Sequence, residues 1–150
     1  MSNKCVVCGT EYEKICPKCR EQLYSTNSFV ISLKLPSLNE YIRECRGNKY
    51  RGAKFKKNFE DIISLYIRTS VGKGSLHSVT TSVYIDFEWH ESTKRRDADN
   101  IASAKKFILD ALCKCSILPD DSRKYVRGFT DVIIDDIKDF VVVTIRERDD

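Results

Sequence analysis

The chain has 150 residues, of which 26 are Lys or Arg and 22 are Asp or Glu, so its formal net charge is +4. This length suits one domain with a small appendage better than two full domains. No apolar run approaches the roughly 18 residues that a membrane span needs, which argues against an integral membrane protein. The opening residues, MSNKCVVCG, lack a secretory apolar stretch, and we therefore expect a cytosolic protein.

Seven cysteines in a reducing cytosol indicate metal ligands or free thiols rather than disulfides. Four of them form two Cys-x-x-Cys pairs, Cys5/Cys8 and Cys16/Cys19, with seven residues between the pairs. Each pair can present two thiolates to one ion, and two pairs complete a tetrahedral site. We expect residues 1–24 to form a minimal zinc ribbon in which Zn²⁺ supplies most of the folding energy. An iron–sulfur site and a redox pair are the alternatives.

Hydrophobic periodicity predicts the elements of the remaining chain. Short runs that alternate or are rich in β-branched and aromatic residues predict strands, and a 3.6-residue repeat predicts helices. Ser37 and Glu40 have the spacing of a capping box, which predicts a helix start. The expected elements are a strand at 29–35, helices at 37–43 and 53–69, one or more strands within 78–90, a helix at 99–115, and strands at 124–134 and 140–146.

This order, β-α-α-β-α-β-β, predicts the fold class. We expect a compact single α/β (α+β) domain over residues 28–148, with a mixed sheet that carries helices on one or both faces.

Basic residues are concentrated in two blocks. Residues 43–57 contain seven Lys or Arg and a single acid, Glu44, and a second block, Lys94-Arg95-Arg96, directly precedes a run of acids. Local basic blocks of this kind indicate a surface for polyphosphate. A solvated helix face is the alternative interpretation.

The stretch 94–112, KRRDADNIASAKKFILDAL, contains most of the candidate chemistry. On one continuous helix its side chains divide into two faces, a polar one with Asp99, Ser103, Lys106 and Asp110, and an apolar one with Ile101, Ala104, Ile108 and Leu112. We expect the apolar face to pack on the sheet. Asp97 precedes the helix, and Asp120 and Asp121 follow it in a loop that can fold back toward its polar face.

Carboxylates clustered beside cations are typical of sites that hold Mg²⁺ against a phosphodiester, because Mg²⁺ prefers hard oxygen ligands. These acids follow three basic residues directly and do not alternate with bases as they would on a solvated face. Structural alternatives exist for each one. Asp97 or Asp99 can cap the helix, Lys106 and Asp110 can form an i,i+4 pair, and Asp120-Asp121 can be a turn.

The basic-basic-Asp-x-Asp-Asn-Ile motif, the following KFILDAL and the short apolar step into Asp-Asp resemble the RusA family of Holliday-junction resolvases, found mainly in phages and prophages. The segments SLNEYIR at 37–43 and AKFKK at 53–57 resemble the amino half of that family. The resemblance covers about residues 29–147. It does not extend to the cysteine module, which the shortest relatives lack.

The resemblance implies site residues. It implies that Asp97, Asp99 and Asp121 bind Mg²⁺, that Lys106 is the essential helix lysine, and that Arg96 contacts DNA. The other expected DNA contacts are Arg95, Arg51, Lys54, Lys56 and Lys57. The helix is about three residues longer than in the founding member. Counting from the upstream acids therefore places Ser103 at the lysine position, counting back from Asp110 places Lys106 there, and Lys105 stays open.

The resemblance further implies a homodimer that resolves a four-way junction, each subunit cutting one of two opposite strands with Mg²⁺. Two other classes remain open. The chain can be a non-catalytic zinc-ribbon protein that binds DNA, or an adaptor whose zinc module docks on phage replication or packaging proteins. Metal-dependent cleavage, or its absence, distinguishes the first of these from a nuclease, and deletion of residues 1–23 tests the second.

Overall fold

In the computed structural model, residues 27–147 are described, and the expected zinc ligands Cys5, Cys8, Cys16 and Cys19 lie outside them. The described chain consists of four strands and four helices. In order they are β1 (Asn27–Ile31), α2 (Leu38–Gly47), α3 (Lys49–Lys73), β2 (Val83–Glu91), α4 (Ala98–Ala102), α5 (Lys105–Lys114), β3 (Val126–Asp135) and β4 (Phe140–Glu147).

The four strands form one mixed sheet in the order β1-β4-β2-β3. β4 pairs antiparallel with both β1 and β2, whereas β3 runs parallel to β2. Parallel neighbours require a long crossover, and α4 and α5 supply it between β2 and β3. Phe87 in the middle of β2 faces Val143 on one side and Asp131 on the other. The expected mixed sheet in an α+β domain is therefore confirmed.

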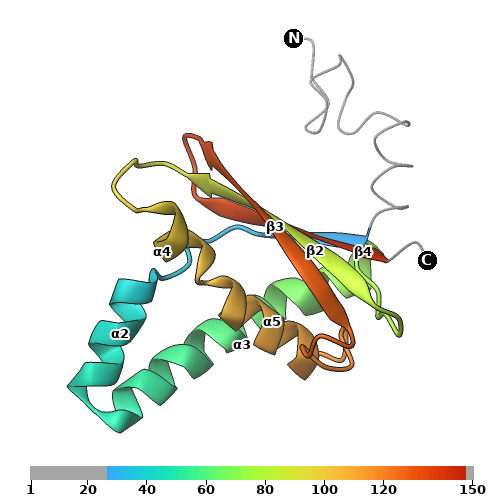
Figure 1. Ribbon diagram of the computed structural model, residues 1–150, viewed down its shortest axis with the longest axis horizontal. Helices are drawn as coiled ribbons and strands as arrows, with labels where there is room; N and C mark the ends of the chain where they lie inside the picture. The colour runs from blue at the N-terminus through green and yellow to red at the C-terminus, as the bar shows by residue number, and fades with distance from the viewer. Residues whose placement is uncertain (1–26, 148–150) are drawn as a thin grey trace.

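The helices cover one face of this sheet (Figure 1). Along β2, the buried positions Val83, Ile85, Phe87 and Trp89 alternate with partly exposed ones. This period of two is the pattern of a strand with one covered and one open face. Of the two arrangements expected from sequence, helices on one face is the one observed.

The helix stretch 98–114 supplies much of the core. Ile101, Ala104, Ile108 and Leu112 are all at most 3% exposed, so the predicted apolar face does pack on the sheet. In α3 the buried aliphatic positions are Ile63 and Ile67, whereas Ile62 is 38% exposed. α3 therefore presents its 63/67 stripe to the sheet, and Ile62 lines a cavity beside β1.

Local hydrogen bonds determine where the first helices begin and end. The Ser37 hydroxyl accepts the Glu40 N–H at 3.2 Å, which confirms the predicted cap of α2. The Asn48 side chain accepts the Arg51 N–H at 2.8 Å and starts α3 four residues before the predicted boundary at Ala53. Gly74 ends α3 in the left-handed conformation with φ 82°.

The prediction of a single helix at 99–115 is wrong, because the chain forms two helices with a break at Ser103–Ala104. At the break the Ala104 N–H bonds to the Ile101 carbonyl at 3.2 Å, an i→i+3 bond that tightens the turn. The Ser103 hydroxyl donates to the Asn100 carbonyl at 2.7 Å, and such local bonds compete with a regular helix.

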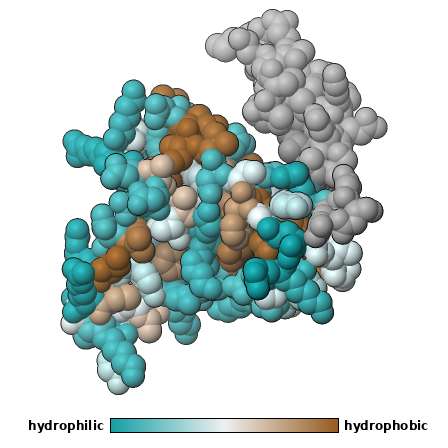
Figure 2. Space-filling model, in the orientation of Figure 1, coloured by the Kyte–Doolittle hydropathy of each residue, from teal (hydrophilic) through white to brown (hydrophobic). Residues whose placement is uncertain are grey.

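The visible surface is mostly hydrophilic, with separate hydrophobic patches, one of them over α2 (Figure 2). Within residues 27–147, no helix combines the length and the apolar character needed to cross a bilayer.

Candidate functional site

Asp97 and Asp99 lie at the start of α4, and both are exposed. Asp97 occupies the N-cap position but makes no side-chain cap hydrogen bond, and Asp99 accepts only the adjacent Asn100 N–H at 3.0 Å. The nearby cations Lys94 and Arg96 pair with other acids. Among the described residues, the two carboxylates are therefore left without a Lys or Arg partner.

Arg96 fixes the backbone directly before these acids. Its Nε donates to Glu91 at 2.8 Å and its Nη1 to the Leu35 carbonyl at 2.8 Å, and its side chain is only 13% exposed. Glu91 at the end of β2 is itself buried. The guanidinium is thus engaged inside the protein, where it ties the 94–97 loop to β2 and to residue 35. Arg96 therefore holds in place the backbone that carries Asp97. The expected contact of Arg96 with DNA stays a prediction.

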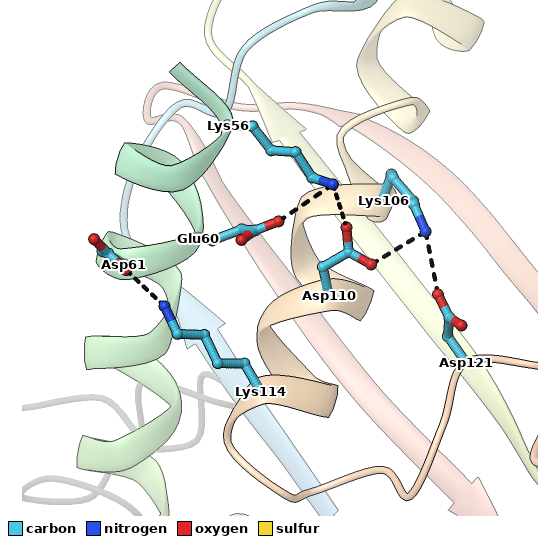
Figure 3. Close-up of polar contacts among 7 residues, drawn as sticks. All are labelled: Lys56, Glu60, Asp61, Lys106, Asp110, Lys114 and Asp121. Atoms are coloured by element: carbon cyan, nitrogen blue, oxygen red, sulfur yellow. Dashed lines mark hydrogen bonds and ion pairs between the residues drawn. The ribbon is translucent and has the colours of Figure 1, made fainter. Parts of the chain in front are cut away.

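A chain of ion pairs joins α3, α5 and the loop after α5 (Figure 3). Lys106 contacts Asp110 at 3.1 Å and Asp121 at 3.2 Å. Asp110 also binds Lys56 of α3 at 3.1 Å, and Lys56 reaches Glu60 at 3.7 Å. The loop carrying Asp121 therefore folds back to the polar face of the helix, as the sequence predicted.

This chain of ion pairs shifts the pKa values of Lys106 and Asp110. Hydrogen bonds to Asp110 and Asp121 raise the pKa of Lys106 above its ordinary value. Burial acts to raise the pKa of Asp110, but hydrogen bonds from Lys106 and Lys56 outweigh it, so that its pKa is lowered. Lys106 is therefore a permanent cation at neutral pH, and Asp110 is a permanent anion.

A pH dependence of stability follows for Asp110. Its folded-state pKa lies below the unfolded value of about 3.9, so its stabilisation is complete above pH 4 and is lost as pH falls through the lowered pKa. Asp110→Asn should lower the free energy of unfolding by about 1 kcal/mol at pH 7. Urea unfolding at pH 7, 4 and 3 should show this difference shrinking with acid. A difference independent of pH would contradict the ion-pair interpretation.

Lys105 belongs to a different cluster from Lys106. Its ammonium contacts Asp131 at 2.6 Å and lies 4.9 Å from the centroid of the Phe129 ring. Asp131 also accepts the Trp89 indole N–H at 2.9 Å. The Lys105 side chain is 22% exposed, against 61% for Lys106. Sequence reasoning missed Asp131, which stands opposite the buried Phe87 in the register of β2 and β3; the signal was an acid within the predicted strand at 124–134.

The expected Mg²⁺ ligands are not gathered into one group. Within residues 27–147, no three or more His, Cys, Asp and Glu side chains are placed to hold a metal ion together. Asp97 and Asp99 fit a hard cation by donor chemistry, because both are exposed carboxylates that contact no Lys or Arg of the described part of the chain. Asp121, the third expected ligand, binds Lys106 instead. The three-acid metal site stays a prediction.

Of the six expected DNA-contacting residues, three pair with acids of the protein and three are exposed without such a contact among the described residues. Arg96 and Lys56 are engaged in the contacts described above. Arg51 is exposed but holds Glu44 through two hydrogen bonds of 3.1 and 3.2 Å. The others are exposed on α3 and on the loop before α4, namely Lys54, Lys57 and Arg95. The first turns of α3 therefore present a basic surface.

Searches of the sequence against protein-family models and among curated proteins return no match. The resemblance to the RusA family accordingly rests on the motif residues themselves, at 94–112 and 118–121, and on the segments 37–43 and 53–57.

Proposed function

We propose that the protein is a RusA-type, Mg²⁺-dependent endodeoxyribonuclease that resolves four-way and other branched DNA. One observation carries the proposal: two exposed carboxylates, Asp97 and Asp99, have no Lys or Arg partner among residues 27–147, and successive backbone turns link them to the exposed Lys106. The Ser103 N–H bonds to the Asp99 carbonyl at 3.1 Å, and the Lys106 N–H bonds to the Ser103 carbonyl at 3.4 Å. Exposed carboxylates suit Mg²⁺, which can assist phosphodiester hydrolysis, and an exposed lysine of the same segment can add positive charge for the phosphate.

In this proposal Asp97, Asp99 and, by resemblance, Asp121 hold the metal. Mg²⁺ held by these carboxylates would supply an activated water molecule and positive charge for the phosphate. Lys106 has a separate role. Because its raised pKa keeps it protonated, it acts as a fixed positive charge for the scissile phosphate and not as a general base.

The basic surface of α3 accounts for binding without base readout. Lys54 and Lys57 are three residues apart on a helix and therefore project from one side of it. Together with Arg95 they can neutralise backbone phosphates, which gives affinity for the shape of DNA and little preference for sequence.

A gel assay with a synthetic four-way junction tests the proposed function. With Mg²⁺ the protein should nick two opposite strands symmetrically, and EDTA should abolish the cuts. A linear duplex with the sequence of one arm is the matched substrate control. Equal cutting of that duplex, or no cutting of the junction, would refute the proposal.

A non-catalytic, junction-binding protein is the second candidate. The absence of a three-acid group within residues 27–147 favours it. It predicts the same binding of the junction with no nick at any Mg²⁺ concentration.

We expect a homodimer in solution, because a junction offers two equivalent strands and a two-fold dimer offers two equivalent sites. Light scattering at micromolar concentration should give twice the mass of the 17.3 kDa chain. A monomer that still makes paired, symmetric cuts would contradict this expectation.

We also expect about one Zn²⁺ per chain, held by Cys5, Cys8, Cys16 and Cys19. Elemental analysis of purified protein should find zinc, and Cys16→Ser with Cys19→Ser should remove it. An iron–sulfur absorption band, or protein free of zinc, would disprove this assignment.

A further inference from the structure

A cavity of about 280 Å³ opens between α2, α3 and the α4–α5 turn. Its apolar walls come from Leu38, Tyr41 and Phe107, and its polar lining includes Lys56, Lys106 and Ser103. Lys106 belongs to both this cavity and the ion-pair chain. The cavity therefore lies directly beside the candidate site.

The aromatic wall is held in place before any ligand arrives. The Tyr41 ring packs edge-on against Phe107, with centroids 5.4 Å apart, and stacks on Phe55 at 6.1 Å. Phe107 is 5% exposed, whereas Leu38 is 41% exposed. Burial and the neighbouring Cys45 raise the pKa of Tyr41, so its phenol stays neutral. The wall is apolar, mostly aromatic and uncharged.

Two ammonium groups line the same cavity. Lys56 contacts Asp110 and Glu60, and Lys106 contacts Asp110 and Asp121. An ammonium has three N–H donors, so each lysine keeps one donor beyond these two contacts. Lysine ammonium groups are charged at neutral pH. An anion at the cavity can therefore bind two cations at once.

We propose that this cavity receives one unstacked nucleobase of the DNA strand, with the adjoining phosphate bound between Lys56 and Lys106. Aromatic walls beside cationic groups match the two parts of a nucleotide, a flat base and a phosphate. The volume lies just below the range of about 300–1,000 Å³ of pockets for drug-sized ligands, which suits a smaller group such as one base. The cost of removing a base from the stack is lowest where pairing or stacking is already interrupted, and a branch point interrupts continuous stacking.

This inference rests on the proposed nuclease function, because the shared Lys106 then places the extruded nucleotide next to the cleaved phosphate. It adds a substrate requirement: the strand must release a base before it is cut. Junctions satisfy this requirement more readily than linear duplexes, which gives a physical reason for selectivity towards branched DNA.

The test uses the full-length protein and four-way junctions that carry 2-aminopurine at one position at a time around the branch point. Ca²⁺ replaces Mg²⁺ to measure binding without cutting. Fluorescence at one position should rise severalfold on binding, as the base leaves its neighbours. Ser103→Phe fills the cavity and should remove the rise. Leu65→Phe adds a ring on an exposed part of α3 outside the cavity and is the matched control.

If the Ser103→Phe protein does not fold, a second variant and a DNA substitution test base binding in the cavity. Leu38→Ala removes an exposed part of the wall and should reduce the fluorescence rise. An abasic nucleotide at the reporting position should weaken junction binding by the parent protein and leave binding by the Leu38→Ala protein less affected. No rise at any position, or an undiminished rise in a folded Ser103→Phe protein, would overturn the proposal.

The two proposals fail separately. Symmetric cutting without a cavity-dependent fluorescence rise would keep the nuclease and reject the base-binding cavity. A cavity-dependent rise without Mg²⁺-dependent cutting would keep the cavity as a DNA site and reject the nuclease.

Discussion

Replacing Asp97 or Asp99 by Asn should reduce junction cleavage by orders of magnitude, while junction binding is retained or becomes tighter. Asn keeps the shape of the side chain but removes the charged oxygen ligand that Mg²⁺ prefers. Removing a negative charge near the phosphates also lowers repulsion. Neither carboxylate caps α4 through its side chain or forms an ion pair with a described residue, so the fold should be unaffected.

Single-turnover cleavage at saturating protein concentration measures this effect apart from binding. Asp61→Asn is the matched control, because Asp61 is an exposed acid of α3 whose partner is Lys114 at 2.9 Å, at the far end of α5. That variant should cut like the parent. If Asp97→Asn and Asp99→Asn also cut like the parent in Mg²⁺, the assignment of these acids as metal ligands is wrong.

Element types were predictable because each depends on a local repeat. The period of two in β2 and the apolar spacing of Ile101, Ile108 and Leu112 are visible in the sequence, and the structure confirms both. The order of the strands was not predictable in this way. β4 is last in the chain but lies between β1 and β2, and only pairing between distant segments determines that position.

The candidate site was only partly predictable, because a helical wheel assumes an unbroken helix. The break at Ser103–Ala104 separates Asp99 in α4 from Lys106 and Asp110 in α5. Of the predicted polar face, only Lys106 and Asp110 form an ion pair with each other. The Ser103 hydroxyl bond to Asn100 is local, but its competition with the helix cannot be read from residue type alone.

The solvent exposure of individual side chains was also not predictable from the sequence. Arg95 and Arg96 are adjacent and chemically alike, yet Arg95 is exposed and Arg96 is mostly buried. The difference arises from a hydrogen bond between Arg96 and the carbonyl of Leu35, which is 61 positions earlier in the chain. A motif therefore locates a candidate residue without showing whether its side chain is available to DNA.

The adjacent lysines Lys105 and Lys106 should give opposite results when each is replaced by Ala. Lys106→Ala should lower cleavage about 100-fold or more, the size of loss found when a preorganised transition-state donor is removed. Its stability should change little, because the side chain is 61% exposed and Ala is a good helix former. Lys106→Arg keeps the charge and should restore part of the activity.

Lys105→Ala should instead lower stability by about 1 kcal/mol, because it removes the contacts of the ammonium with Asp131 and with the Phe129 ring. Cleavage by the folded protein should stay within severalfold of the parent, since Lys105 faces the sheet and not the ion-pair chain of Lys106. Thermal unfolding and single-turnover cleavage of both variants, measured together, separate the two roles. If Lys105→Ala lost cleavage at unchanged stability, the essential lysine would be Lys105 and not Lys106. The Lys105 side chain would then have to leave Asp131 when DNA is bound.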